Sequence, residues 1–271
     1  MTLDCELVQT RGGALAVRDK ATGELMHRTG PMIESQRLYV GPSRLAVRLR
    51  ESNSAPLVVL DVGLGAGSNA LAAWRCSESS AGPRRRLRII SLDRSLAALE
   101  LALAPQNAHA FGLIEGAGEA ARGLLARGQH EAANTEWELR LGEIESLLPE
   151  LRAELADIVF WDPFSPRVNP GLWTCATLTA VRRACRSAAT LHTYSGATSV
   201  RAALLLAGFA VGAGDKVSEG KFATCAATSP ELLEQPLDRR WLERLSRSTA
   251  PFPADAPPDA WLRIVALPQF T

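Results

Sequence analysis

The sequence has few features of a metalloprotein, a disulfide-stabilised scaffold or a membrane protein. Its five cysteines are scattered and odd in number, without a C-x-x-C pair, and its four histidines show no metal-ligand spacing. We therefore expect no metal site, no disulfide framework and a reducing, cytoplasmic location. The N-terminus lacks the basic and apolar regions of a signal peptide, and no apolar run is long enough to span a bilayer, so we expect no membrane partner.

A strong charge of one sign is also missing. The 271 residues carry 30 Lys and Arg against 29 Asp and Glu, so no global basic field of the kind found in many nucleic-acid binders is present. Basic residues do gather in three clusters, which are Arg84, Arg85, Arg86 and Arg88, then Arg182, Arg183 and Arg186, then Arg239, Arg240, Arg244 and Arg247. Each cluster is typical either of a solvated face or of a local anion-binding patch.

Strand and helix patterns alternate through most of the chain, and the composition is that of a globular protein, 46% hydrophobic and 22% charged. The expected strands are 58–61, 87–92, 137–141, 158–161 and 189–194, with a closing antiparallel pair at 209–213 and 222–227. The expected helices are 68–76, 96–103, 117–127, 144–155, 172–185 and 199–207. This alternation predicts an α/β, Rossmann-like fold with a seven-stranded, mostly parallel sheet and helices on both faces.

The two ends of the chain are expected to flank this fold. Residues 5–26 predict a β-hairpin, and residues 30–49 predict helices broken at Pro42. The segment 230–271 is expected to wrap the domain with one helix around 239–247. The predicted organisation is therefore an N-terminal hairpin and helical cap (1–56), a ligand-binding domain (57–229) and a C-terminal wrapping segment (230–271).

A glycine-rich turn follows the first of the expected parallel strands. The apolar residues 57–60 end in Asp61, and glycine then occupies positions 63, 65 and 67. Gly63, Gly65 and Gly67 would let the backbone approach a nucleotide-like ligand. A dinucleotide fingerprint needs a third glycine where Ser68 stands, and Asp61 would repel a pyrophosphate. The turn therefore favours a ligand without phosphates that carries an ammonium group, which is S-adenosylmethionine.

Two further acids follow the next two strands of this series. Asp93 ends the strand at 87–92, where a carboxylate can accept both ribose hydroxyls of the ligand. Glu143 follows the strand at 137–141, where an acid can accept the exocyclic amine of adenine. Any one such acid could be a solvated strand end, but three in register with three strands predict binding of S-adenosylmethionine.

The segment Asp162-Pro163-Phe164 ends the fourth of these strands. The carboxyl ends of strands face the ligand crevice in open α/β sheets, so we expect Asp162 to lie near the cofactor's reactive methyl group. A carboxylate there can hold an amine in line and accept its proton. Pro163 stiffens the turn and Phe164 can form a wall. The alternative is that Asp162 only caps the following turn or helix.

The run from Asp162 to Thr174 resembles the D-x-F-x-P-x-x-N-P-x-x-W motif of the MnmC-like methyltransferases. The resemblance continues through residues 190–195 and 207–209, and it spans about 30 to 228. It implies a class I methyltransferase fold, S-adenosylmethionine as cofactor and methylation of an aminomethyl nitrogen on the wobble uridine of tRNA. It also implies that Asp162 lies at the reaction centre and that Pro163, Asn169, Trp173 and Tyr194 serve the substrate.

The sequence departs from this family at three places. Pro163 replaces a usual small residue, residues 220–224 differ from a basic, glycine-rich stretch, and the flavin-dependent oxidase half is absent, so a separate oxidase is expected to act upstream. Three alternatives stay open. They are a methyltransferase acting on a small-molecule or protein amine, a non-catalytic nucleotide-binding protein and an NAD-dependent oxidoreductase.

Overall fold

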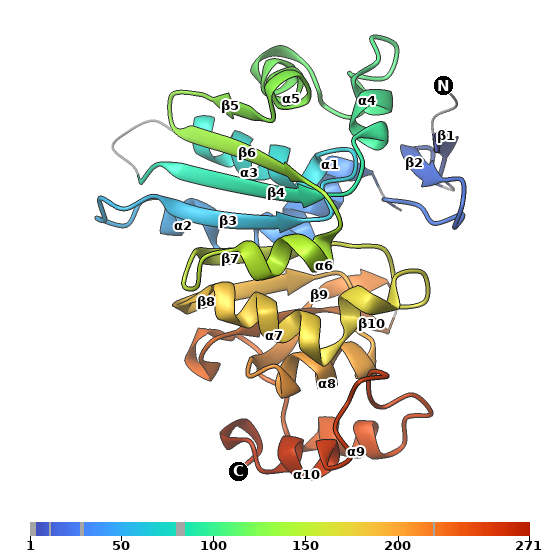
Figure 1. Cartoon of the computed structure of the whole chain (residues 1–271), viewed down its shortest axis with the longest axis vertical. Helices are drawn as coiled ribbons and strands as arrows, with labels where there is room; N and C mark the ends of the chain where they lie inside the picture. Colours follow the sequence, from blue (N-terminus) through green and yellow to red (C-terminus); the bar gives the residue numbers. More distant parts are fainter. Residues whose placement is uncertain (1–3, 11, 28–29, 80–84, 219) are drawn as a thin grey trace. The chain divides into compact units, whose positions relative to one another are not determined.

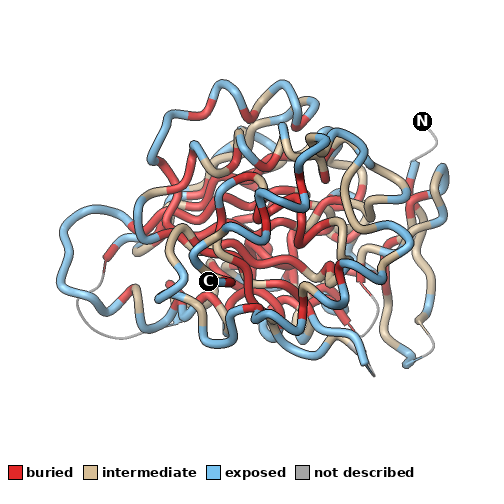
Figure 2. The backbone as a smooth tube through the Cα atoms, turned by 90° about the horizontal axis from the view of Figure 1, so that it is seen from below, coloured by how far each residue is buried: buried red, intermediate tan, exposed pale blue. Residues whose placement is uncertain are grey.

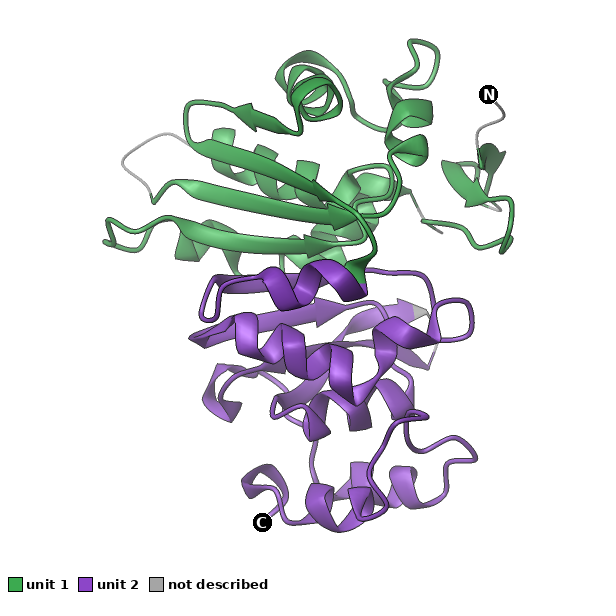
Figure 3. Ribbon diagram, in the orientation of Figure 1, with its two compact units in different colours: residues 1–144 green, residues 145–271 purple. Residues whose placement is uncertain are grey.

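The computed structural model describes residues 4–10, 12–27, 30–79, 85–218 and 220–271. The chain divides into two units, residues 1–144 and 145–271 (Figure 3). Each unit combines strands with helices (Figure 1). The α/β class predicted from the sequence is therefore confirmed.

An antiparallel hairpin opens unit 1, and a helical segment follows it. The strands β1 (Cys5–Gln9) and β2 (Leu15–Asp19) pair along their whole length. The helical segment comprises α1 (Pro31–Ser35), the π-helix η1 (Gln36–Val40) and α2 (Leu45–Arg48). Pro31 begins α1, where its fixed φ and missing N–H suit a helix start. The break expected at Pro42 lies between η1 and α2, so the predictions for this region are confirmed.

Four further strands of unit 1 lie in the order β5-β6-β4-β3. β3 runs parallel to β4, β4 runs parallel to β6, and β5 is antiparallel to β6. The elements are β3 Leu57–Val62, α3 Ser68–Glu78, β4 Leu87–Asp93, α4 Ala97–Leu103, α5 Glu115–Arg127, β5 Gln129–Glu131 and β6 Thr135–Leu141. Every residue of β3 is buried, as its apolar run predicts for a strand covered on both faces. Figure 2 colours the buried stretches of the chain red.

Unit 2 carries four strands in the order β7-β8-β10-β9. β7 and β8 are parallel, whereas β10 is antiparallel to both β8 and β9, which confirms the predicted closing pair. The strands are β7 Ala156–Trp161, β8 Cys185–Thr193, β9 Ala210–Ser218 and β10 Lys221–Ala227. The helices are α6 Ile144–Leu147, η2 Leu148–Glu150, η3 Pro170–Trp173, α7 Cys175–Ala184, α8 Thr198–Leu206, η4 Pro230–Leu232, α9 Arg239–Ser246, α10 Ala260–Val265 and η5 Pro268–Phe270.

The segment after residue 229 lies along the outer edge of β9. Leu237 donates its N–H to the Val211 carbonyl, and the Gln269 side chain bonds both backbone groups of Val211. The Trp241 ring of α9 stacks on Phe270 with 6.0 Å between centroids. These contacts cover a strand edge that would otherwise be open for pairing with another chain. The helix predicted around 239–247 is confirmed as α9, whereas α10 was not predicted.

Three predictions about elements were wrong in detail. The helix expected at 144–155 ends its α-helical part at Leu147 and its 3-10 turn at Glu150, because Pro149 has no N–H to continue an α-helix. The helix expected at 172–185 is interrupted at Thr174, whose hydroxyl caps α7 by accepting from Thr177 N. The short β5 brings the strands of the described chain, outside the hairpin, to eight instead of seven. The three-part domain organisation stays a prediction.

Candidate functional site

The glycine turn between β3 and α3 adopts a backbone shape that favours glycine. Gly63, Gly65 and Gly67 have φ values of 87°, 54° and 83°. A Cβ on Gly65 would lie 3.2 Å from Met26 Sδ, and one on Gly67 would lie 3.2 Å from Leu99 Cδ1. All three glycines therefore meet a conformational demand, and Gly65 and Gly67 meet a steric one as well.

The side chain of Asp93, at the end of β4, binds the backbone of this turn. Its Oδ2 accepts the Gly65 N–H at 2.9 Å, and its Oδ1 accepts the Ser95 N–H at 3.1 Å. Gly63 N donates to the carbonyl of Leu92, the residue before Asp93, at 3.0 Å. Burial raises the pKa of Asp93, whereas the bond from Gly65 acts to lower it. A carboxylate can accept more hydrogen bonds than these two, so Asp93 keeps the capacity to bind ribose hydroxyls. This role of Asp93 stays a prediction.

Asp61 is fully buried inside β3 and belongs to a chain of side-chain hydrogen bonds. Its Oδ2 accepts from the Ser91 hydroxyl at 2.7 Å, and the same hydroxyl accepts from Trp137 Nε1 at 3.0 Å. Its Oδ1 is buried and has no hydrogen-bond partner among the described residues. Burial raises the pKa of Asp61 to about 7, and the nearby charge of Asp93 adds to this rise. A buried acceptor without a partner is a place where a ligand or water donor fits.

The third predicted acid, Glu143, is exposed and lies two residues after the end of β6. Because β3, β4 and β6 are parallel, the strand ends that carry Asp61, Asp93 and Glu143 lie at one edge of the unit 1 strands. The Gly142 N–H donates to the Asp93 carbonyl at 2.9 Å, which places the Glu143 segment beside Asp93. The structure thus brings together the three predicted acids of unit 1.

Sequence reasoning missed a contact between the N-terminal segment and the glycine turn. His27 is buried, and its Nε2 lies 3.1 Å from the Ser68 hydroxyl at the start of α3. Burial lowers the pKa of His27 to about 4, against an opposing effect of the Glu34 charge. Together with Met26, this histidine covers the turn. A lone histidine 41 positions from its partner gives no local signal in the sequence.

In unit 2, Asp162 follows β7 directly and is half-buried. The two residues after it are fixed through their carbonyl oxygens. The Tyr194 hydroxyl donates to the Pro163 carbonyl at 3.0 Å, and Trp173 Nε1 donates to the Phe164 carbonyl at 2.8 Å. The Asp162 loop is therefore held by Tyr194, directly after β8, and by Trp173 of η3.

The rings that hold this loop also pack against one another. Trp173 is edge-on to Trp161 with 6.3 Å between centroids, and edge-on to Tyr194 with 6.1 Å. Such edge-to-face pairs are favourable and orient both rings. Asn169 precedes η3, and its N–H closes a turn onto the Ser165 carbonyl at 2.9 Å. The structure thus brings together the predicted substrate residues of unit 2 around the Asp162 loop.

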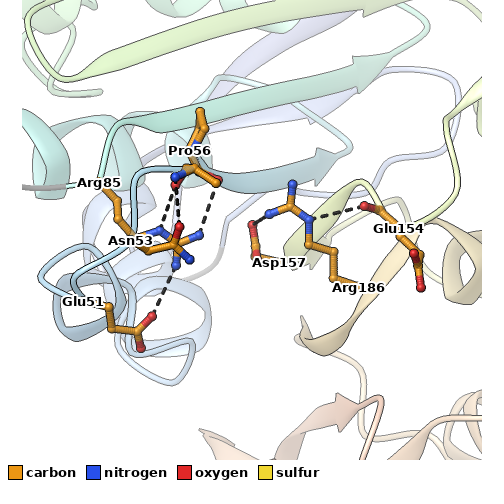
Figure 4. Close-up of polar contacts among 8 residues, drawn as sticks. Glu51, Asn53, Pro56, Arg85, Glu154, Asp157 and Arg186 are labelled. Atoms are coloured by element: carbon orange, nitrogen blue, oxygen red, sulfur yellow. Dashed lines mark hydrogen bonds and ion pairs between the residues drawn. The ribbon is translucent and has the colours of Figure 1, made fainter.

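Two of the three basic clusters are engaged within the protein. Arg85 is buried, donates to the carbonyls of Ala55 and Pro56 and pairs with Glu51 (Figure 4). The other described members of its cluster pair with acids, Arg86 with Glu131 and Arg88 with Glu138, and Arg84 lies outside the described residues. These arginines stabilise unit 1 and have carboxylates beside them.

The second cluster has the same character in unit 2. Arg186 pairs with Asp157 at 2.7 Å and donates to the Glu154 carbonyl (Figure 4). Arg183 donates to three carbonyls around η2, and Arg182 donates to the Gly208 carbonyl. These bonds join β8 to β7 and the end of α7 to neighbouring backbone carbonyls, so the cluster is structural. In the third cluster, Arg239 donates to the carbonyls of Phe270 and Thr271, whereas Arg244 and Arg247 make no ion pair with a described residue.

None of the described helices is both long and apolar enough to span a membrane. The described residues also contain no group of three or more His, Cys, Asp or Glu side chains placed to hold a metal ion.

Comparison with known proteins defines the class of this chain. The family model of S-adenosyl-L-methionine-dependent methyltransferases matches residues 121–229, which include Glu143 and the Asp162 loop. A spermidine synthase from Thermotoga maritima shares the fold, with a TM-score of 0.55 at 12% identity over 90% of this chain and 75% of that chain. The chain thus has a Rossmann-like, class I fold and is similar in sequence to the S-adenosylmethionine-dependent methyltransferases.

More similar proteins narrow the family. The crystal structure of MNMC2 from Aquifex aeolicus matches with a TM-score of 0.75 and 27% identity, over 97% of this chain and 86% of that chain. The bifunctional protein MnmC of tRNA 5-methylaminomethyl-2-thiouridine biosynthesis is 33% identical in Aromatoleum aromaticum over 70% of this chain, and 32% identical in Pseudomonas paraeruginosa over 66%. The chain belongs to the MnmC-like methyltransferases. It spans 30% and 28% of the length of these two relatives.

Proposed function

We propose that the chain transfers a methyl group from S-adenosylmethionine to the aminomethyl nitrogen of a tRNA wobble uridine, of the 5-aminomethyl-2-thiouridine type. Similarity to relatives named for tRNA 5-methylaminomethyl-2-thiouridine biosynthesis carries this proposal. The Asp162 loop, where Tyr194 and Trp173 hold the adjoining carbonyls, supports it as a built reaction centre.

The glycine turn of unit 1 fits the cofactor. Gly63, Gly65 and Gly67 leave the backbone open to close approach, and the unpartnered Oδ1 of Asp61 is suited to accept from an ammonium group or from a water bound to it. We assign Asp93 to the ribose hydroxyls and Glu143 to the adenine amine. Bound S-adenosylmethionine supplies a methyl group on a sulfonium, which reacts with a nucleophile that has a free lone pair.

The proton chemistry falls to Asp162. An aliphatic amine is protonated near neutral pH, so its lone pair becomes free only after a proton leaves. We assign Asp162 to hold the amine in line and to accept that proton, beside the cofactor. Phe164 and Pro163 form the wall and the stiff turn beside it, and Asn169, Trp173 and Tyr194 shape the substrate side. A flavin-dependent oxidase activity would act first and expose the amine.

A second candidate substrate is an amine of a small molecule or a protein. The near-neutral net charge favours it, because tRNA binding depends on neutralising phosphates. The engagement of Arg85 and Arg186 within the protein favours it too. Both candidates use the same cofactor and the same carboxylate, so only the acceptor distinguishes them.

The test is transfer of a labelled methyl group to bulk tRNA that lacks this modification, followed by nucleoside analysis. We expect the label in a methylaminomethyl uridine, with bulk tRNA that already carries the modification as the negative control. Cofactor binding by calorimetry is measured on the same sample. Intact cofactor binding without label in tRNA would overturn the tRNA assignment and favour the small-molecule or protein amine.

A further inference from the structure

A pocket on unit 2 gathers two arginines and three hydroxyl side chains. Its volume is about 370 Å³, and its lining residues are Thr198, Arg244, Arg247, Ser248 and Thr249. Thr198 is the first residue of α8, and Arg244 lies on α9. The lining therefore offers donors of two kinds, guanidinium and hydroxyl, and contains no carboxylate.

The two arginines of this pocket lack the ion pairs with acids that Arg85 and Arg186 of the other two clusters form. Arg244 is exposed and makes no hydrogen bond or ion pair with any residue that the structure describes. Arg247 uses only its Nε, which donates to the Glu243 carbonyl at 3.1 Å, so its terminal nitrogens are available. Neither arginine forms an ion pair with a described acid, so both guanidinium groups are available to an anion in the pocket.

A third guanidinium adds to this charge from below the surface. Arg201 of α8 is buried and donates to two neutral oxygens, Thr224 Oγ1 and the Ala223 carbonyl. Burial lowers the pKa of Arg201 to about 10, and the positive charge of Arg244 lowers it further. Two like charges held within electrostatic reach of each other favour an anion between or above them.

We propose that this pocket binds a backbone phosphate of the RNA substrate. Guanidinium groups and hydroxyls are the donors that phosphate oxygens accept, and arginine forks match phosphate geometry. The start of α8 contributes as well, because its N-cap, Ala197, has no side chain to cap the first N–H groups. The choice of RNA as the source of the phosphate rests on the proposed function, whereas the anion chemistry follows from the pocket itself.

The pocket lies near the chain segment that supports the Asp162 loop. Thr198 lies four residues after Tyr194, so the Cα atoms of these two residues are at most about 14 Å apart. The Tyr194 hydroxyl in turn donates to the Pro163 carbonyl. The parallel strands β7 and β8 end at the same edge, before Asp162 and Tyr194 respectively. An RNA strand whose reactive nucleotide is held at Asp162 would therefore have a phosphate of a nearby nucleotide within reach of the pocket.

The test compares the wild-type chain with the double variant Arg244→Ala/Arg247→Ala for binding of unmodified bulk tRNA over a series of salt concentrations. We expect affinity to fall roughly tenfold and the slope of log affinity against log salt to decrease by about 1 to 2. The control is Arg263→Ala, which removes an exposed arginine paired with Asp259 on α10. Its affinity and slope should stay close to those of wild type.

A second measurement keeps the outcome interpretable. Titration with inorganic phosphate, followed by NMR shifts of the Ser248 and Thr249 amides, should show binding by wild type and none by the double variant. Unchanged tRNA affinity in the double variant would overturn the pocket and leave the methyltransferase proposal untouched. Phosphate binding without any tRNA binding by wild type would overturn RNA as the source, together with the tRNA substrate. Failure of methyl transfer with pocket-dependent tRNA binding would sink the proposed function alone.

Discussion

The backbone N–H of Gly65 donates to Oδ2 of Asp93 at 2.9 Å, across 28 positions of the sequence. The bond ties the middle of the glycine turn to the end of β4. A side chain predicted to bind the cofactor thus also supports the shape of the turn. The two roles use different acceptor sites of one carboxylate.

Removing this carboxylate should therefore weaken cofactor binding through the turn. We expect Asp93→Ala to lower the affinity for S-adenosylmethionine more than tenfold, since the Gly65 N–H loses a charge-assisted bond. Asp93→Asn keeps one acceptor oxygen, so its affinity for S-adenosylmethionine should lie between those of the wild type and Asp93→Ala. Calorimetric titration measures both, with Glu119→Ala, an exposed acid on α5, as the control. Equal affinities for all four proteins would refute the role of Asp93.

Gly65→Val should abolish cofactor binding. A valine there would need a φ of 54°, and its Cβ would lie 3.2 Å from Met26 Sδ. The matched control is Gly23→Val, which has the same type of strained φ, 72°, but open space around its Cβ. If both variants bind the cofactor as wild type does, the glycine turn is not the binding site.

Asp61 should make the stability of the cofactor-free protein depend on pH. Burial raises its folded-state pKa to about 7, whereas the unfolded value is about 3.9. Protonated Asp61 therefore contributes fully to the free energy of unfolding below about pH 4. This contribution is lost as the pH rises to about 7, and the free energy of unfolding does not change further through Asp61 above that pH. The full loss is on the order of 4 kcal/mol.

The variant Asp61→Asn isolates this contribution, because the amide keeps an acceptor for Ser91 but does not titrate. Urea unfolding at several pH values between 4 and 8 should show the wild type losing stability relative to the variant as the pH rises. His27 acts in the opposite direction, since burial lowers its pKa to about 4, so only the difference between the two proteins is informative. Parallel pH profiles would show that Asp61 does not titrate in this range.

The parts of the site that sequence analysis predicted are those that depend on local pattern. Three alternating glycines after a buried strand, and acids at the ends of successive parallel strands, follow from residues a few positions apart. The bonds from Ser91 to Asp61 and from Ser68 to His27 join residues 30 and 41 positions apart. They depend on strand register and on the course of the N-terminal segment, which periodicity does not specify.

The roles of Trp173 and Tyr194 also depend on contacts that the sequence motif does not specify. The motif places both residues near Asp162, but it does not distinguish a substrate contact from a structural one. In the structure, each donates a hydrogen bond to a carbonyl of the Asp162 loop. Their support of the loop was therefore not predictable from the motif alone.

The variants Trp173→Phe and Tyr194→Phe should slow methyl transfer through the position of the loop. Each removes one donor and leaves a carbonyl without its partner, at a cost of about 1 kcal/mol of stability. We expect kcat to fall about tenfold, with cofactor affinity unchanged. Trp241→Phe is the matched control, because the buried Trp241 Nε1 has no partner among the described residues. A normal kcat for both loop variants would show that these bonds do not position Asp162.

Asp162→Asn should remove most of the methyl transfer while cofactor affinity changes less than about twofold. The amide keeps the size of the carboxylate but cannot accept a proton, and a positioned general base contributes roughly 100-fold or more. A base role also predicts a pH effect that a turn-capping role does not. As the pH approaches the pKa of the substrate amine, solvent removes the proton and the variant should regain rate relative to wild type. The control is Asp215→Asn, an exposed acid on β9. A variant that turns over normally, or one whose deficit is the same at every pH, would contradict the assignment of Asp162 as the proton acceptor.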